Sequence, residues 1–71
     1  EEYVDDRPHD GAYRKLVVRD DRIVGMTFLG DLHNAGVIAS LMKKRTDVSS
    51  VKRNMLSPSF GYSEVAGLLN G

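Results

Sequence analysis

Two apolar-rich stretches, 12–19 and 22–29, lie on either side of the pair Asp20-Asp21. The first stretch contains two valines and a tyrosine, and the second contains isoleucine, valine, threonine and phenylalanine. These residue types are common in β-strands. Tight hairpin turns need positive φ angles, and aspartate adopts these more readily than most residues. The pattern therefore predicts a β-hairpin made of these two strands. A looser loop that includes Arg22 is the alternative for the turn.

The second predicted strand is unusual because regular alternation gives it apolar residues on both faces. Val24, Met26 and Phe28 fall on one face, and Ile23 and Leu29 fall on the other. A strand with one face in water normally alternates apolar and polar side chains. We expect the rest of the chain to cover one face of the strand well. The apolar residues on the second face then indicate that this chain docks onto a larger protein body.

Two helices are predicted after the hairpin. The first spans about 31–44, with Asp31 as its N-cap and apolar residues recurring at helical spacing. The second spans about 47–56, is capped by Thr46 or Asp47, and ends before a Ser-Pro pair. These elements predict an α+β fold in which a small antiparallel sheet is covered by two helices.

The chain divides into three parts by composition. Residues 1–11 form a charged lead-in, in which 2–5 is either a short edge strand or a frayed segment. Residues 12–56 form the predicted α+β domain, and residues 57–71 form a C-terminal extension. A chain of 71 residues makes one small domain or part of one. It begins with glutamate, which fits a piece of a longer protein.

Charge and composition narrow the function classes. Ten basic and ten acidic residues give a net charge of zero, which argues against a nucleic-acid binder, although the basic run 43–45 keeps that class as a weak alternative. No apolar run is long enough to span a bilayer. The absence of cysteine excludes disulfides and thiolate metal sites, and it fits a reducing, cytoplasmic compartment.

The candidates for chemistry give no predicted catalytic or metal site. His9 and His33 match no standard ligand spacing, and we interpret both as solvated side chains. The aspartate pairs at 5–6 and 20–21 fall on a flexible lead and a turn, and not in an enclosed pocket suited to acid–base work. The chain has no GxGxxG or Walker sequence, so we expect it to bind no nucleotide or other cofactor by itself.

More apolar side chains are present than a small sheet with two helices needs for its core. The excess predicts a partner interface, with an irregular core as the equally weighted alternative. A homodimer built on this apolar surface is the second functional hypothesis. The predicted interface residues are Val24, Met26, Phe28, Phe60, Tyr62, Leu68 and Leu69.

The order and spacing of several short motifs resemble a known family. The segment YRKLVVRDDRIVGMTFLGD is followed by NAG in the first predicted helix and then by TDVSSVKRNMLSP. This is similar to the C-terminal domain of FAD-dependent NAD(P)H oxidoreductases of the NADH–rubredoxin reductase and NAD(P)H nitrite reductase branch. The resemblance covers about residues 11–56. The matching positions are Tyr13, Lys15, Leu16, Val17, Ile23, Val24, Gly25, Gly30 and Asp31.

The resemblance implies an accessory domain, non-catalytic alone, that packs beside FAD- and NAD(P)H-binding domains or a flavoprotein subunit. FAD and NAD(P)H are then cofactors of the parent protein and not of this chain. The resemblance assigns no flavin-binding residue here, and it does not extend to the last segment, 57–71.

Overall fold

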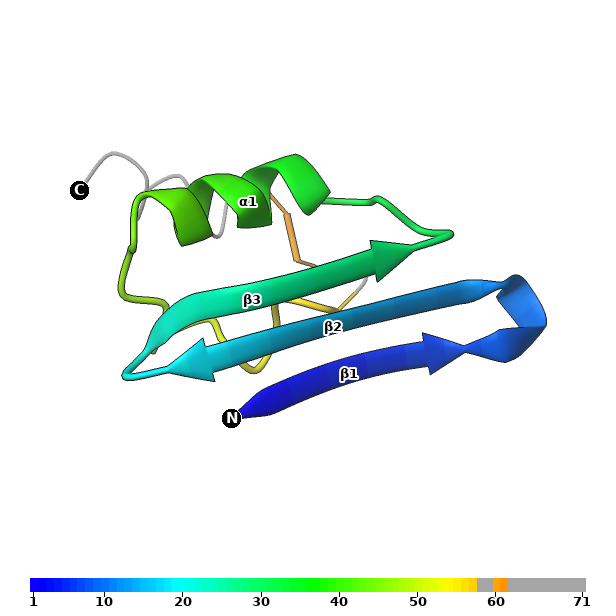
Figure 1. Ribbon diagram of the computed structural model, residues 1–71, viewed down its shortest axis with the longest axis horizontal. Coiled ribbons are helices and arrows are strands. Elements are labelled where there is room, and N and C mark those ends of the chain that lie inside the picture. The colour runs from blue at the N-terminus through cyan, green and yellow to red at the C-terminus, as the bar shows by residue number, and fades with distance from the viewer. Residues whose placement is uncertain (58–59, 62–71) are drawn as a thin grey trace.

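The structure is a computed structural model that describes residues 1–57 and 60–61. Three antiparallel strands form one sheet in the order β1-β2-β3, and one α-helix follows them (Figure 1). The elements are β1 (Glu2–Arg7), the 3₁₀ turn η1 (Pro8–Asp10), β2 (Ala12–Arg19), β3 (Arg22–Leu29) and α1 (Ala35–Lys43). The predicted α+β class and hairpin are confirmed. The edge strand is confirmed as well, and it extends to Arg7.

The hairpin turn has the backbone that its sequence suggested. Asp20 and Asp21 have φ angles of 53° and 61°. Positive φ at both central residues matches the right-handed twist of the strands that the turn joins. The prediction of a two-residue turn is therefore confirmed, and the looser loop that includes Arg22 does not form.

A β-bulge changes the faces of β3 from those that regular alternation predicts. Val17 pairs with Gly25, but its neighbour Val18 pairs with Ile23, so Val24 is the extra residue. Cross-strand partners lie on the same face of a sheet. Ile23 therefore shares its face with Met26, the partner of the buried Leu16, and not with Leu29. The predicted division of these side chains between the two faces is wrong.

One face of the sheet carries the core. Ile38 and Leu41 of α1 pack on it, together with Val48 and Met55 from the segment that follows the helix. Figure 1 shows α1 running alongside β3, while nothing that the structure describes passes in front of the strands. The sheet therefore has one covered face. The buried core residues are Leu16, Val18, Ile23, Ile38, Leu41, Val48, Met55 and Phe60.

The helix begins four residues later than predicted, and Asp31 is not its N-cap. Asn34 has a φ of 64°, which helical backbone cannot continue, so α1 begins at Ala35. The Asn34 side-chain amide donates to the carbonyl oxygen of Phe60 at 2.7 Å, a long-range bond that fixes this turn. Asp31 instead accepts from the backbone N–H of His33 at 2.9 Å. A tertiary contact has therefore overridden the local capping signal.

The second predicted helix, 47–56, does not form. Its backbone N–H groups bond mostly three residues back, as in successive turns, and not four residues back as in an α-helix. Serine, valine and asparagine are weak helix formers and give this segment little local preference. Tertiary contacts then decide its path, because Val48 donates to the Asp21 carbonyl at 2.8 Å and Lys52 pairs with both Asp21 and Glu1.

Candidate functional site

A buried arginine organises one end of the sheet's covered face. Arg14 is 3% exposed, although its class of side chain is rarely buried without a partner. Its Nε and Nη2 donate to one Asp5 carboxylate oxygen at 2.9 and 2.7 Å, and Nη2 also donates to the Leu56 carbonyl at 2.7 Å. The guanidinium carbon lies 5.8 Å from the Phe28 ring centre. Arg14 thus joins all three strands to the last turn before residue 57.

The register of the sheet explains why these groups meet. Asp5 of β1 and Phe28 of β3 are the direct cross-strand partners of Arg14, so all three side chains lie on the covered face. Opposite charges directly across a strand pair are favourable. A one-residue slip of β1 would send Asp5 to the other face and bring either Val4 or Asp6 opposite Arg14.

A second arginine connects this pair to the turn after β3. Arg7 Nη2 donates to Asp31 and lies 3.1 Å from the Asp5 carboxylate. Gly30, which precedes Asp31, has a φ of 76° and lies against the backbone of Gly11. A Cβ on residue 30 would clash with the Gly11 carbonyl oxygen. Only glycine fits this close approach of two backbones. The Gly30-Asp31 pair is therefore one structural unit, in which glycine makes the turn and aspartate bonds Arg7.

The arginines hold both carboxylates in the ionised form. The hydrogen bond from Arg14 is the main reason that the pKa of Asp5 lies below its usual value. The hydrogen bond from Arg7, followed by the His33 backbone N–H, lowers the pKa of Asp31. A carboxylate with a lowered pKa is a poor general acid or base near neutral pH. These two carboxylates are therefore better suited to positioning charged groups than to proton transfer.

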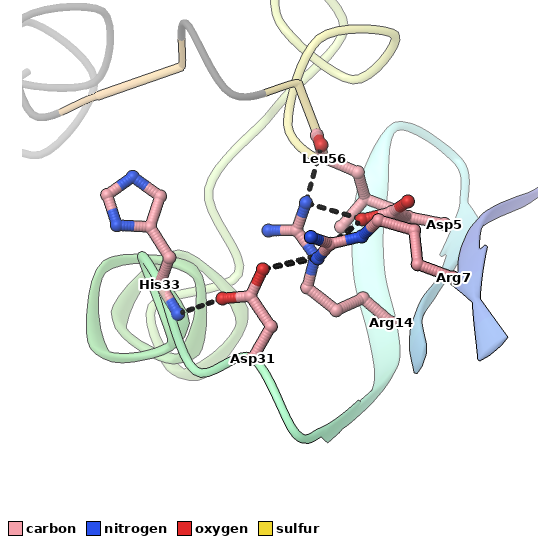
Figure 2. Close-up of a pocket in the computed structure, with 6 residues that line it drawn as sticks. All are labelled: Asp5, Arg7, Arg14, Asp31, His33 and Leu56. Atoms are coloured by element: carbon pink, nitrogen blue, oxygen red, sulfur yellow. Dashed lines mark hydrogen bonds and ion pairs between the residues drawn. The ribbon is translucent and has the colours of Figure 1, made fainter. Parts of the chain in front are cut away.

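An open pocket of about 270 Å³ lies against the cluster. Figure 2 shows the Arg14 guanidinium and the carboxylate of Asp31 on one side of it and the His33 ring on the other. His33 itself is exposed, and its backbone ties it to Asp31. The pocket therefore combines a fixed arginine with a solvent-accessible imidazole. Among residues 1–57 and 60–61, those that line the pocket are Asp5, Arg7, Arg14, Asp31, His33 and Leu56.

Comparison with known proteins places this fold in a family. The family model for the rubredoxin NAD⁺ reductase C-terminal domain matches residues 1–46. The chain belongs to this family. It is a C-terminal domain of the kind found in NADH–rubredoxin reductase-like oxidoreductases. No curated protein and no solved structure matches the chain.

The match begins ten residues before the resemblance seen in the sequence. It includes β1, the strand that supplies Asp5 and Arg7, and it ends after α1. The matched part of the chain contains the charged residues Asp5, Arg7, Arg14 and Asp31, while Leu56 lies beyond it. Within residues 1–11, predicted to be a charged lead-in or an edge strand, Glu2–Arg7 form the edge strand β1.

The predicted interface residues fall into three groups in this rubredoxin reductase C-terminal domain. Val24 is half exposed, at the bulge. Met26 and Phe28 are partly buried and pack against the core, and Phe60 is a core residue at 2% exposure. The excess that suggested an interface is therefore partly used in an irregular core. The remaining three, Tyr62, Leu68 and Leu69, lie outside the described residues.

Sequence analysis missed the cluster because it treated Asp5 as part of a flexible lead and gave Arg14 no role. One signal could have found Arg14: it alternates with Leu16 and Val18, so a strand places it on their buried face. Its partner could be found only from the register of β1. Among residues 1–57 and 60–61, no three histidine or acidic side chains converge as a metal site. No helix in this part of the chain has the length and hydropathy of a membrane span.

Proposed function

We propose that this chain is a non-catalytic accessory domain of a flavin-dependent NAD(P)H oxidoreductase, in which it packs beside the FAD- and NAD(P)H-binding domains. Family membership supports an accessory domain of an oxidoreductase. The sequence itself has no glycine-rich fingerprint for a dinucleotide. The carboxylates of the Arg14 cluster are held as ions by arginines, which suits binding better than catalysis.

The observation that carries the proposal is the second face of the sheet. By register this face holds alternate residues of all three strands, and no element of the described chain covers it (Figure 1). Val4 and Leu29, at its two edges, are 53% and 60% exposed. The residues on this open face are Glu2, Val4, Asp6, Tyr13, Lys15, Val17, Gly25, Thr27 and Leu29.

The composition of the open face suits contact with another domain. Apolar side chains alternate with charged ones, and Lys15 pairs with Glu2 across the strands at 3.3 Å. Interfaces between domains of one chain are more polar than a core and tolerate such a mixture. An antiparallel sheet commonly has one solvated face, so the face by itself does not require cover. Family membership supports a neighbouring domain, and the open face offers a surface for that domain.

Co-purification with the parent's flavin-binding and NAD(P)H-binding domains tests the proposal. The variant Val4→Glu with Leu29→Glu places two charges on the open face, and we expect it to weaken the complex by about tenfold or more. The matched control is Leu32→Glu. Leu32 is 68% exposed, but it comes after the last strand and is not part of the open face. The readout is co-elution of the chain with the flavin absorbance, with circular dichroism to show that each variant folds.

Equal co-elution of wild type and the double variant would contradict the assignment of the open face. No complex with the wild-type chain would contradict the proposed function itself. Light scattering on the isolated chain tests the homodimer hypothesis, which predicts a dimer that the same double variant converts to a monomer.

A further inference from the structure

The Arg14 guanidinium has more hydrogen-bond donors than its partners use. Arginine carries its N–H groups in a rigid planar fork, with one on Nε and a pair on each Nη nitrogen. Asp5 and the Leu56 carbonyl take the Nε donor and both Nη2 donors. No hydrogen bond or ion pair within the described residues uses Nη1. Because the rest of the fork is fixed and the side chain is 4% exposed, Nη1 is held in one direction.

That direction leads into the pocket. Figure 2 shows the free nitrogen of Arg14 pointing into the space between the guanidinium and the His33 ring. The one buried side-chain nitrogen or oxygen without a partner among residues 1–57 and 60–61 is Arg7 Nε, so Arg14 Nη1 is open to the pocket. Both observations show arginine donors at this cluster without a protein partner in the described part of the chain. An incoming group with acceptor oxygens would complete it.

The charge balance indicates what kind of group fits. The two arginines and the two carboxylates cancel, so long-range attraction is weak and recognition depends on directed hydrogen bonds. An anion receives stronger hydrogen bonds from a guanidinium than a neutral carbonyl does. His33 lines the opposite side of the pocket with an exposed imidazole, a second donor. Two donors facing each other across a pocket suit a group with at least two oxygens.

We propose that this pocket is an oxyanion-binding site, in which one ligand oxygen accepts from Arg14 Nη1 and another accepts from the His33 imidazole. A carboxylate and a phosphate share this chemistry. The carboxylate would come from an acidic side chain on a neighbouring protein surface, whereas a phosphate would come from a free anion. This inference concerns the cluster end of the covered face and is independent of whether the open face packs against another domain.

Nuclear magnetic resonance titration of the full chain tests the site with two probes. Capped aspartate, N-acetyl-aspartyl amide, represents a protein carboxylate, and inorganic phosphate represents a free anion. We expect saturable shifts of the Arg14 side-chain N–H and of the backbone N–H groups of His33 and Leu56. Preference for one probe identifies the source. Shifts confined to the exposed basic run 43–45, or shifts that never saturate, would overturn the proposal.

Two histidine variants give the matched comparison. His33→Ala removes an exposed imidazole that makes no side-chain bond within the described residues, so it leaves the fold intact. Loss of one hydrogen bond to an anion should weaken binding about three- to tenfold. His9→Ala, the control, removes an exposed imidazole that lies outside the pocket and should leave affinity unchanged. Equal affinity of wild type and both variants would overturn the role of His33 and the two-donor site with it.

Discussion

The two ends of the sheet's covered face are stabilised in different ways. At one end Leu16, Val18 and Ile23 are almost completely buried among apolar side chains. At the other end, on the same strands, Arg14 is equally buried but is surrounded by carboxylates, a carbonyl and the Phe28 ring. Arg14 is as buried as the apolar residues, so the exposed fraction of the side chain alone does not distinguish the two ends. The apolar end is stabilised by the area of apolar contact, whereas the Arg14 end is stabilised by the direction of its hydrogen bonds.

Apolar burial contributes in proportion to the area removed from water and is not directional. A buried charge contributes only when its partners satisfy it, and it costs free energy when one partner is removed. The apolar end should therefore tolerate changes of shape better than changes of size. The Arg14 end should tolerate neither loss of charge nor a shift of the fork. It is also the end where one donor of the fork, Arg14 Nη1, has no partner among the described residues.

The largest effect is expected from Ile23→Ala at the apolar end. Truncating a fully buried isoleucine removes apolar contact and leaves a cavity, which should lower the free energy of unfolding by about 4 kcal/mol. Its neighbour Val24 is half exposed at the bulge, so Val24→Ala should cost less than about 1 kcal/mol. Urea denaturation followed by circular dichroism measures both. A larger loss for Val24→Ala than for Ile23→Ala would mean that β3 is regular and has no bulge.

The next effect is expected from Arg14→Ala at the charged end. The substitution leaves Asp5 and the Leu56 carbonyl without their donor and should cost about 3 kcal/mol. Arg14→Lys should lower the free energy of unfolding by nearly as much as Arg14→Ala, because a single ammonium group cannot reproduce the planar fork. Arg19→Ala, an exposed arginine on the same strand, is the control and should stay within about 0.5 kcal/mol. A small loss for Arg14→Ala would show that the ion pairs contribute little.

The smallest effect is expected from acid. Asp5 and Asp31 have folded pKa values below the ordinary value of 3.8, so the unfolded chain takes up protons first as pH falls. Their stabilising contribution is complete above about pH 5 and is lost as pH falls through the ordinary pKa toward the folded values. The urea concentration at the unfolding midpoint of wild type should therefore decrease once the pH is lowered below about 5.

Two variants separate this acid effect from general loss of stability. Asp31→Asn should show a shallower decrease, because one of the two linked carboxylates is gone. Ile23→Val changes only apolar contact and should lower the midpoint by the same amount at every pH. The role of the cluster in acid sensitivity would be excluded if the curve of Asp31→Asn ran parallel to that of wild type.

The predictions from sequence succeeded where the signal was local. The Asp20-Asp21 turn and both hairpin strands follow from residue preferences within a few positions, and the family resemblance used the same stretch. They failed where a distant contact decided the outcome. Asp31 has the composition of a helix cap, but the bond from Asn34 to Phe60 moves the helix start to Ala35.

The candidate site was beyond reach for a related reason. Alternation along β2 is sufficient to place Arg14 on the buried face, but its partners come from positions 5, 31 and 56. Three different registers or turns must form before these groups meet. A single chain gives no signal for such distant pairings, because each of the acidic residues is equally well explained locally as a turn or lead-in residue.

The sequence by itself determined the strands, the hairpin turn, the apolar content of the core and the family to which the chain belongs. These depend on residue preferences and on alternation, which act over a few residues. Only the tertiary structure decided the bulge at Val24, the irregular path after the helix, and the burial of Arg14 between Asp5 and Leu56. Each of these is set by groups far apart in the chain, which compete successfully with local preference because they satisfy buried polar groups or fill the core.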